Sequence, residues 1–227
     1  ALAGAGARIV MGCRNPTTAA AAVDEVRRRT GNDAVESRSL DLADLDHVRR
    51  FAASLSDLDR VDVLINNAGL MLDRRQESPQ GHESTFAINH LGPFLLTGLL
   101  LDHLAPAARV VNVASCVHAD GRADFESAAA PRGGGGFPTA LYARSKLANV
   151  LHTLALARRL AGSGLAANCV HPGIVDSNLL PWFVRIVKPL VRPVVFDCER
   201  GARSTLHAAL APALAGTRGL YLDEHQQ

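Results

Sequence analysis

The sequence predicts a doubly wound parallel α/β sheet in a single domain, and three observations lead to that prediction. Short runs of β-branched and apolar residues alternate with longer helical patterns, which is typical of a parallel sheet covered by helices on both faces. The 227 residues suit one domain of ordinary size. No internal repeat and no shift in composition marks a second domain, so we expect residues 1–227 to form one unit.

The element boundaries follow from turn and capping signals. We expect strands at 7–13, 35–40, 61–66, 109–113, 166–171 and 220–222. We expect helices at 17–30, 45–56, 81–105, 139–162 and 200–211. Asp44 is placed to cap the second helix, because a short acidic side chain can accept from the free amides of a first turn. Residues 119–138, with a run of four glycines, read as a surface loop.

Composition and charge exclude several classes of protein. Apolar residues make up 48% and charged residues 20%, which is a folded globular composition. The net charge of +2 is too small to indicate nucleic acid, and the basic residues are scattered apart from the run at 27–29. We find no apolar run of the length needed to cross a bilayer. The four cysteines lack metal-binding spacing and are expected as packed thiols in a reducing compartment: Cys13, Cys116, Cys169 and Cys198.

The strongest chemical signal is the pair Tyr142 and Lys146 near the start of a long helical pattern. Positions i and i+4 share one helix face, so the phenol and the ammonium can point into the same site. A phenol has a pKa of about 10, and a nearby cation lowers that pKa toward values useful for general acid–base catalysis. The spacing alone is common by chance and also describes a surface tyrosine beside a solvated lysine.

Other polar residues fall in order along the same chain. Ser115 follows the strand at 109–113, and Asn66–Gly69 closes the strand at 61–66. Ligands in open α/β sheets gather outside such carboxyl ends. Asn89 lies inside a predicted helix, where an amide usually has a reason such as a local kink or a bound water. Each feature has a structural reading of its own, as a cap, a turn or a buried hydrogen bonder, but their joint order indicates a site.

These blocks resemble the short-chain dehydrogenase/reductase family, and within it the retinol-dehydrogenase-like group. The resemblance runs essentially from end to end and implies a Rossmann-like sheet. The matching blocks are Asn66-Asn-Ala-Gly69, Asn89-His-Leu-Gly-Pro-Phe-Leu-Leu-Thr97, Arg109-Val-Val-Asn-Val-Ala-Ser115, Tyr142-Ala-Arg-Ser-Lys146-Leu-Ala-Asn149 and His171-Pro-Gly-Ile-Val175.

The resemblance implies catalytic roles for Ser115, Tyr142 and Lys146, with Asn89 organising a proton relay. Ser115 then holds the substrate oxygen, Tyr142 moves its proton, and Lys146 holds the nicotinamide ribose and stabilises the phenolate. The cofactor-binding residues that the resemblance implies, besides Tyr142 and Lys146, are Asn67, Ala68, Gly69, Pro172, Gly173, Val175 and Ser177, together with the adenine-contacting pair Asp41 and Leu42. Helix capping is an alternative role for Asp41.

The end of the first strand bears on cofactor choice. In a dinucleotide fold that strand end meets the adenosine ribose, and an acidic residue there favours NAD. Cys13-Arg14-Asn15 offers no carboxylate, and Arg14 can face a 2′-phosphate instead. The sequence therefore favours NADP over NAD, with a plain surface arginine as the alternative reading of Arg14.

The glycines at the start of the chain do not form a phosphate loop. Gly4-Ala5-Gly6 follows no strand, has Ile9 at the third glycine position, and leads into a strand where a phosphate loop would open a helix. Aligned to the family, residues 1–6 are the tail of the first helix, and the first strand with its glycine-rich turn would lie before residue 1. We therefore expect the domain to be incomplete at its N-terminus, and residues 1–227 by themselves to fold poorly and to bind no NADPH.

The expected function is that of an NADP-dependent oxidoreductase that interconverts a lipophilic alcohol and its aldehyde or ketone. Retinoids are the best-known substrates of the group. A reductase of steroid or other lipid carbonyls and an inactive truncated product are the alternatives.

Residues 177–196 are the expected substrate lid. Within them, 179–196 mix Trp182 and Phe183 with basic residues, a composition that also suits a membrane surface. An ordinary amphipathic cover over the core is the other reading. The full-length protein is expected inside the cell at the endoplasmic reticulum or another membrane, and the chain as given is expected to be soluble.

Overall fold

The computed structural model of this chain describes residues 1–124, 138–175 and 195–225. Its strands pair in parallel, which confirms the predicted class of sheet. The strands are β1 (Ile9–Cys13), β2 (Val35–Ser39), β3 (Val61–Asn66), β4 (Leu104–Val113), β5 (Ala166–Val170), β6 (Ile174–Val175), β7 (Val195–Phe196) and β8 (Tyr221–Leu222). The α-helices are α1 (Pro16–Thr30), α2 (Leu45–Ser54), α3 (Ser84–Phe86), α4 (Gly92–Leu100), α6 (Pro138–Arg159) and α9 (Cys198–Leu210).

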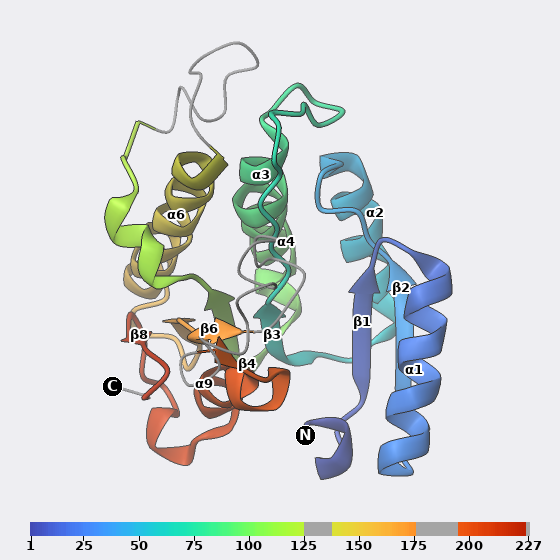
Figure 1. The fold of residues 1–227 in the computed structure, drawn as a ribbon. Helices are drawn as coiled ribbons and strands as arrows, with labels where there is room; N and C mark the ends of the chain where they lie inside the picture. The colour runs from blue at the N-terminus through green and yellow to red at the C-terminus, as the bar shows by residue number, and fades with distance from the viewer. Residues whose placement is uncertain (125–137, 176–194, 226–227) are drawn as a thin grey trace.

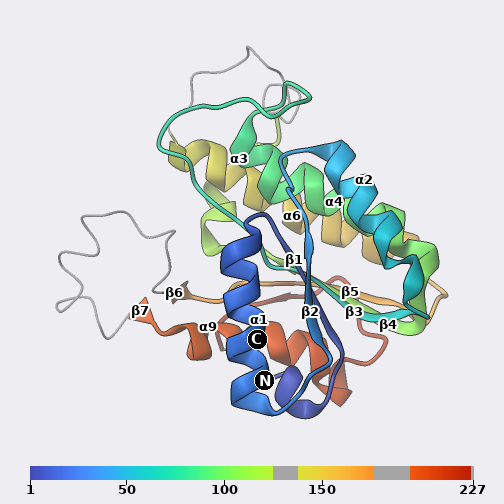
Figure 2. The ribbon, with the colours of Figure 1, turned by 90° about the vertical axis from the view of Figure 1, so that its right-hand side faces the viewer.

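Helices cover both faces of the strands (Figure 1 and Figure 2), as a doubly wound fold requires. α2, α4 and α6 lie on one face, and α1 and α9 lie on the other. β4 packs against the helices on both faces of the sheet, because successive side chains of a strand point to opposite faces. Val110 packs with Leu156 of α6 and with Leu160 just after that helix, whereas Val111 packs with Ala208 of α9.

The longer strands form two sheets that share no ladder within the described ranges. β1 pairs with β2, while β3, β4, β5 and β8 pair in that order. A hydrophobic cluster joins the two sheets instead, with Leu40, Phe51 and Leu96 at its centre and Val10 and Leu64 packed against it. Among the described residues, one edge of β1 and one edge of β3 therefore carry backbone groups without strand partners. This is the place where the family resemblance puts a further strand.

The N-terminal glycines behave as the sequence predicts. Ala3–Ala5 is a single 3₁₀ turn, and Gly6 ends it with a left-handed φ of 84°. The chain then enters β1, so no helix begins at these glycines. Asp44 caps α2 as expected, since its carboxylate accepts from the Asp46 amide at 3.0 Å.

The helix predicted at 81–105 is wrong at both ends. Gly81 has a φ of 80° and lies in a turn, and the helix starts only at α3. The Glu83 carboxylate caps that start by accepting from two amides of the first turn. Residues Ala87–Leu91 form a π-helical turn. β4 begins at Leu104, five residues before the predicted strand, so the end of the predicted helix overlaps the start of β4.

One stretch among the described residues, Ser84–His103, is long and apolar enough to cross a membrane. The expectation that the chain lacks such a run is therefore wrong. However, most of the apolar part of this stretch is buried, and its helices pack against α2 and α6. A core helix of the doubly wound fold accounts for its apolar character.

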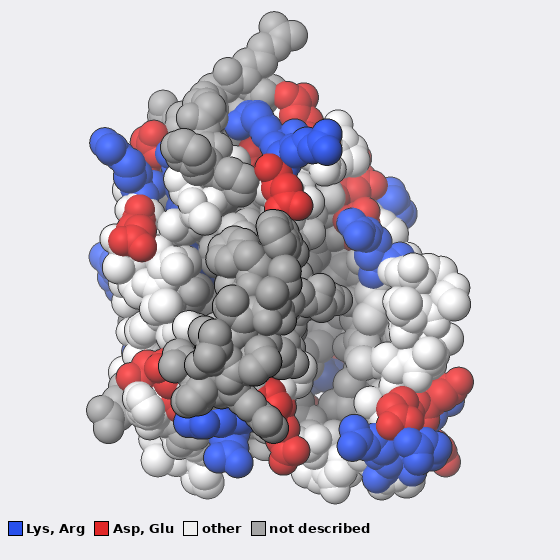
Figure 3. All heavy atoms as spheres, viewed as in Figure 1, with Lys and Arg blue, Asp and Glu red and all other residues white. Residues whose placement is uncertain are grey.

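Acidic and basic side chains are interspersed on the face shown in Figure 3. The basic run on α1 is part of this mixture. Arg28 and Arg29 pair with Glu25, and Arg27 Nε donates to the Val35 carbonyl at 3.0 Å. The run is thus used for local contacts and forms no separate basic patch.

Some expectations fall wholly or partly outside the described residues. Ser177, most of the expected lid at 177–196, and most of the expected loop at 119–138 lie there. The four cysteines are all free thiols, but only Cys169 is buried, while Cys116 and Cys198 are exposed. The expectation of four packed thiols is therefore wrong for these two, which line a cavity described below.

Candidate active site

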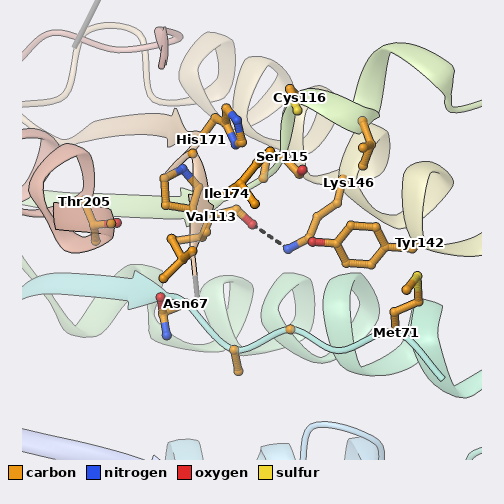
Figure 4. A pocket seen from close by; sticks show the side chains of 18 of the residues that line it. Asn67, Met71, Val113, Ser115, Cys116, Tyr142, Lys146, His171, Ile174 and Thr205 are labelled. Atoms are coloured by element: carbon orange, nitrogen blue, oxygen red, sulfur yellow. Dashed lines mark hydrogen bonds between the residues drawn. The ribbon is translucent and has the colours of Figure 1, made fainter. Parts of the chain in front are cut away.

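A cavity of about 1280 Å³ opens at the carboxyl ends of β3, β4 and β5. This is where a parallel sheet presents the residues that follow its strands. Figure 4 shows the side chains that converge there. The predicted site residues in its wall are Asn67, Ala68, Gly69, Ser115, Tyr142, Lys146, Pro172, Gly173 and Val175.

Ser115, Tyr142 and Lys146 meet in this cavity although 31 residues separate the first from the last (Figure 4). Tyr142 and Lys146 lie one turn apart on α6, with Lys146 Nζ 5.5 Å from the centroid of the Tyr142 ring. A side-chain hydrogen bond joins Ser115 and Tyr142. Lys146 Nζ donates to the Val113 carbonyl at 2.9 Å, which anchors the ammonium beside the end of β4. The geometry gives one phenol a hydroxyl partner and a neighbouring cation.

The expected lowering of the Tyr142 pKa is wrong for this arrangement. Burial raises the pKa of Tyr142 to about 12, against a smaller lowering by the Ser115 hydrogen bond. Burial also lowers the pKa of Lys146 to about 8, because the charged ammonium loses solvation. Lys146 therefore stays mostly protonated at neutral pH. Tyr142 is protonated as well, so it stands as a proton donor to an oxygen placed next to it.

Asn89 lies in the π-helical turn and is almost fully buried. Its side chain accepts from the Leu70 amide and donates to the Leu70 carbonyl, both at 2.8 Å. It also donates to Ser145 Oγ at 3.0 Å, and Ser145 in turn donates to the Tyr142 carbonyl. The amide thus ties the segment after β3 to the turn of α6 that carries Tyr142. A part for Asn89 in proton transfer stays a prediction.

Gly69 brings the backbone after β3 close to the lysine. A Cβ built at this position would lie 3.1 Å from Lys146 Nζ and 3.6 Å from Asn89 Oδ1. Such a contact is tight, so the ammonium would have to move. Glycine here lets the turn Asn67–Gly69 approach the cavity floor.

We therefore expect Gly69→Ala to lower kcat about tenfold while costing on the order of 1–2 kcal/mol of stability, because the added methyl displaces Lys146. Steady-state kinetics and thermal unfolding of the full-length protein measure the two effects. Gly98→Ala is the matched control, since a Cβ at Gly98 on α4 meets nothing within 4 Å. It should keep full activity and gain up to ~1 kcal/mol, as alanine favours the helix. Equal kcat values in both variants would remove Gly69 from this role.

The segment after β5 is held by two close contacts, each between a glycine and a side chain. Gly173 has a left-handed φ of 78°, and a Cβ there would lie 2.5 Å from the Phe196 ring. Val175 packs directly on Gly201 of α9, where a Cβ would lie 2.4 Å from its side chain. Ile174 and Val175 form β6 with β7, a pairing that the sequence did not reveal. These contacts hold residues 172–175 along the cavity wall.

The residues that we expect to bind the adenosine end of the cofactor lie outside this cavity. Arg14, Asp41 and Leu42 follow the first two strands and do not line the cavity. Arg14 is exposed and has no side-chain ion pair or hydrogen bond in the described part of the chain. The Asp41 carboxylate accepts from the Ala43 amide at 2.9 Å, which is a local turn and not the cap of α2. Leu42 packs against Gly92 of α4.

The residues present fit a nicotinamide dinucleotide at two places. The cavity offers glycine-lined backbone beside Tyr142 and Lys146, suited to a ribose and a flat ring. Arg14 leaves a guanidinium free at the end of β1, suited to a phosphate.

Sequence reasoning missed part of the cavity wall. Met71, Val117 and Leu206 give it apolar lining, and Cys116 and Cys198 place two thiols there. The position of Cys116, directly after Ser115, could have shown that it lies near the site. The others come from segments without any motif.

Comparison with known proteins agrees with this fold and site. Residues 1–182 match the short chain dehydrogenase family. Retinol dehydrogenase 12 of Homo sapiens is 40% identical over 229 residues, which cover 98% of this chain and 72% of that protein. Retinol dehydrogenase 13 of Homo sapiens is 38% identical over 243 residues, covering 100% of this chain and 71% of that protein. The crystal structure of a blue fluorescent protein from a metagenomic library in complex with NADPH is 28% identical, with a TM-score of 0.75, and covers 98% of this chain and 87% of that one.

The parallel sheet and the Ser115–Tyr142–Lys146 cavity define an oxidoreductase of the dinucleotide-binding class. The chain belongs to the short-chain dehydrogenase/reductase family.

Proposed function

We propose that this protein is an NADP-dependent oxidoreductase that interconverts a lipophilic alcohol and its aldehyde or ketone, with retinoids as the substrate class. The observation that supports this most is the hydrogen-bonded pair of Ser115 and Tyr142 beside Lys146, at the end of β4 in a large cavity. The names of the relatives point to retinol, and the structural relative with NADPH points to the cofactor.

The residues divide the chemistry between them. Ser115 holds the substrate oxygen next to the Tyr142 hydroxyl. Tyr142 then gives its proton to that oxygen in reduction; in oxidation the tyrosine must first be ionised, and its phenolate takes the proton of the alcohol. Lys146 stabilises the phenolate that remains and holds the ribose beside it. When bound, the nicotinamide supplies or accepts the hydride. The protein contributes position and charge.

The cavity wall favours an apolar substrate. Met71, Val117 and Leu206 line it from three separate segments of the chain, so a hydrocarbon body can be removed from water there. The catalytic residues alone do not separate retinoids from steroids or other lipid carbonyls. The proposal includes a peripheral membrane contact through residues 179–196, which rests on their composition. It also places the protein at the endoplasmic reticulum or another membrane, which rests on the family resemblance.

The function is tested by assaying the full-length protein with retinal and with a steroid ketone, each with NADPH and with NADH. We expect NADPH-dependent reduction of retinal at the higher kcat/KM. Arg14→Ala should lower kcat/KM for NADPH about tenfold or more, because a charge-assisted phosphate contact is worth ~1.5–3 kcal/mol. The value for NADH should barely change, since NADH lacks the 2′-phosphate.

Arg8→Ala is the matched control for this variant. Arg8 is also exposed and close to β1, but it pairs with Glu36 at 3.2 Å. It should leave the preference for NADPH unchanged. Equal losses for both cofactors in Arg14→Ala would remove Arg14 from cofactor choice, and no turnover with either cofactor would overturn the proposed function.

A further inference from the structure

An asparagine and a histidine lie directly behind the catalytic residues. Asn149 is buried on α6, three residues beyond Lys146. His90 lies in the π-helical turn that also carries Asn89. Neither Asn149 nor His90 is among the described residues that line the cavity, and the mechanism given above assigns no part to either.

The Asn149 side chain contacts two backbone carbonyls that belong to different elements. Its Nδ2 donates to the Asn89 carbonyl at 3.0 Å. The same nitrogen lies 3.5 Å from the Val113 carbonyl, which is a weaker contact. Lys146 Nζ donates to this same Val113 carbonyl at 2.9 Å (Figure 4). Because positions i and i+3 share one face of a helix, both side chains of α6 reach the end of β4 together.

His90 fixes the orientation of the Asn149 amide. His90 Nδ1 lies 3.0 Å from Asn149 Oδ1. Since Asn149 Nδ2 faces carbonyl oxygens, Oδ1 is the accepting end of the amide, so His90 Nδ1 carries the proton of this bond. Burial lowers the pKa of His90, against a smaller opposite effect of the Asn149 bond, so the ring is neutral at neutral pH. The ring is held beside Phe86 and Phe94, with centroids 5.1 and 5.7 Å from its own.

Asn89 connects this network to the catalytic residues. Its side chain binds the backbone of Leu70 and the hydroxyl of Ser145, which is the residue before Lys146 on α6. Asn149 thus joins three segments that surround the catalytic lysine, namely the end of β4, the π-helical turn and α6 itself. A shift of any of them would move the ammonium or its acceptor.

We propose that Asn149 is a positioning residue for Lys146, and that His90 orients the Asn149 amide for this task. Asn149 acts through the Val113 and Asn89 carbonyls and not on the substrate or the cofactor. The proposal deepens the function given above and rests on it. Its physical basis is that a displacement of a catalytic group by about 1 Å can lower a rate about a hundredfold.

The first test replaces Asn149 by an apolar side chain of nearly the same shape. Asn149→Leu leaves the Asn89 and Val113 carbonyls without their amide donor, so the turn and the end of β4 are free to shift. We expect kcat for the reduction of retinal with NADPH to fall about tenfold or more. The KM for retinal should change at most a few-fold, because Asn149 is not in the cavity wall. Steady-state kinetics of the full-length protein measures both.

Asn168→Leu is the matched control. Asn168 is also a buried asparagine, and its amide donates to the Thr217 carbonyl at 2.9 Å and accepts from the Leu220 amide at 3.0 Å. Both variants lose buried hydrogen bonds, so both should lower the melting temperature by several degrees. Only Asn149→Leu should lower kcat. Equal kcat values in the two variants would show that Asn149 is structural and would overturn the proposal.

A second pair of variants tests the histidine, and it also decides the question if Asn149→Leu fails to fold. In His90→Asn, the side-chain amide can still donate to Asn149 Oδ1 from about the position of Nδ1. In His90→Leu, a side chain of the same size has no donor. We expect His90→Asn to keep kcat within a few-fold of the wild type and His90→Leu to lower it about tenfold. Equal kcat values in this pair would contradict the part given to His90.

Hydrogen exchange supplies a readout that needs no turnover. The Leu70 amide donates to Asn89 Oδ1, so its exchange rate reports whether the π-helical turn is held in place. Asn149→Leu should speed this exchange about tenfold or more, and Asn168→Leu should leave it unchanged. If the wild type reduces no carbonyl compound with NADPH, the proposed function fails and this exchange decides the positioning separately. Unchanged Leu70 exchange in Asn149→Leu would then overturn it.

Discussion

Tyr142→Phe is expected to lower kcat roughly a thousandfold, the order of magnitude that a positioned acid–base group contributes. The phenylalanine ring fills the same space, so the cavity and the position of Lys146 should persist. Only the proton that the hydroxyl moves is lost. Steady-state turnover of the best alcohol or aldehyde substrate by the full-length protein measures the effect.

The cofactor provides the control for this variant. NADPH affinity should stay within a few-fold of the wild type, because the phenol oxygen is one contact among many. Thermal unfolding should also be little changed, since the Tyr142 hydroxyl binds only Ser115 among the described side chains. A variant that keeps most of its kcat would show that Tyr142 is not the acid–base group, and the mechanism would then be wrong.

Much of the fold was predictable because its signals are local. β3 matches the predicted 61–66, β1 and β2 agree within two residues, and α1 begins one residue earlier than predicted. Each of these elements has a clear apolar pattern and a turn or cap beside it. Asn15, for example, caps α1 by accepting from the Thr17 and Thr18 amides.

The predictions are wrong where contacts between distant parts of the chain determine the local structure. The π-helical turn at Ala87–Leu91 accompanies the contacts of Asn89 with Leu70 and Ser145, which no local pattern reveals. The pKa of Tyr142 was misjudged because the sequence shows a neighbouring cation but not the burial that outweighs it.

The same reasoning explains which parts of the site were visible. The motif residues Ser115, Tyr142 and Lys146 could be named because the family blocks mark them. The apolar wall residues Met71, Val117 and Leu206 could not be, since they come from segments without a motif. A two-residue strand such as β8 also leaves only a weak pattern in the sequence.

The separation of the two sheets predicts a large effect on the stability of the chain. We expect residues 1–227, expressed by themselves, to lack a sharp thermal transition and to show no measurable binding of NADPH. β1 and β3 each present an edge without strand partners among the described residues, and none of their residues is fully buried. Burial of apolar surface stabilises by roughly 25 cal/mol per Å², so leaving these two apolar strands partly exposed removes part of the ~5–15 kcal/mol that holds a typical domain folded.

Hydrogen exchange and calorimetry measure this expectation directly. Amides between β4 and β5 should be the most protected, because this pair lies inside the four-stranded sheet and is packed on both faces. Amides of β1 and β2 should exchange much faster, since only the cluster around Leu40, Phe51 and Leu96 couples that pair to the larger sheet. A chain with a family-like strand and glycine-rich turn added before Ala1 is the comparison, and it should show a cooperative transition and NADPH binding. Uniform protection of both sheets, with micromolar binding of NADPH by residues 1–227 alone, would show that the hydrophobic cluster suffices to hold the two sheets together.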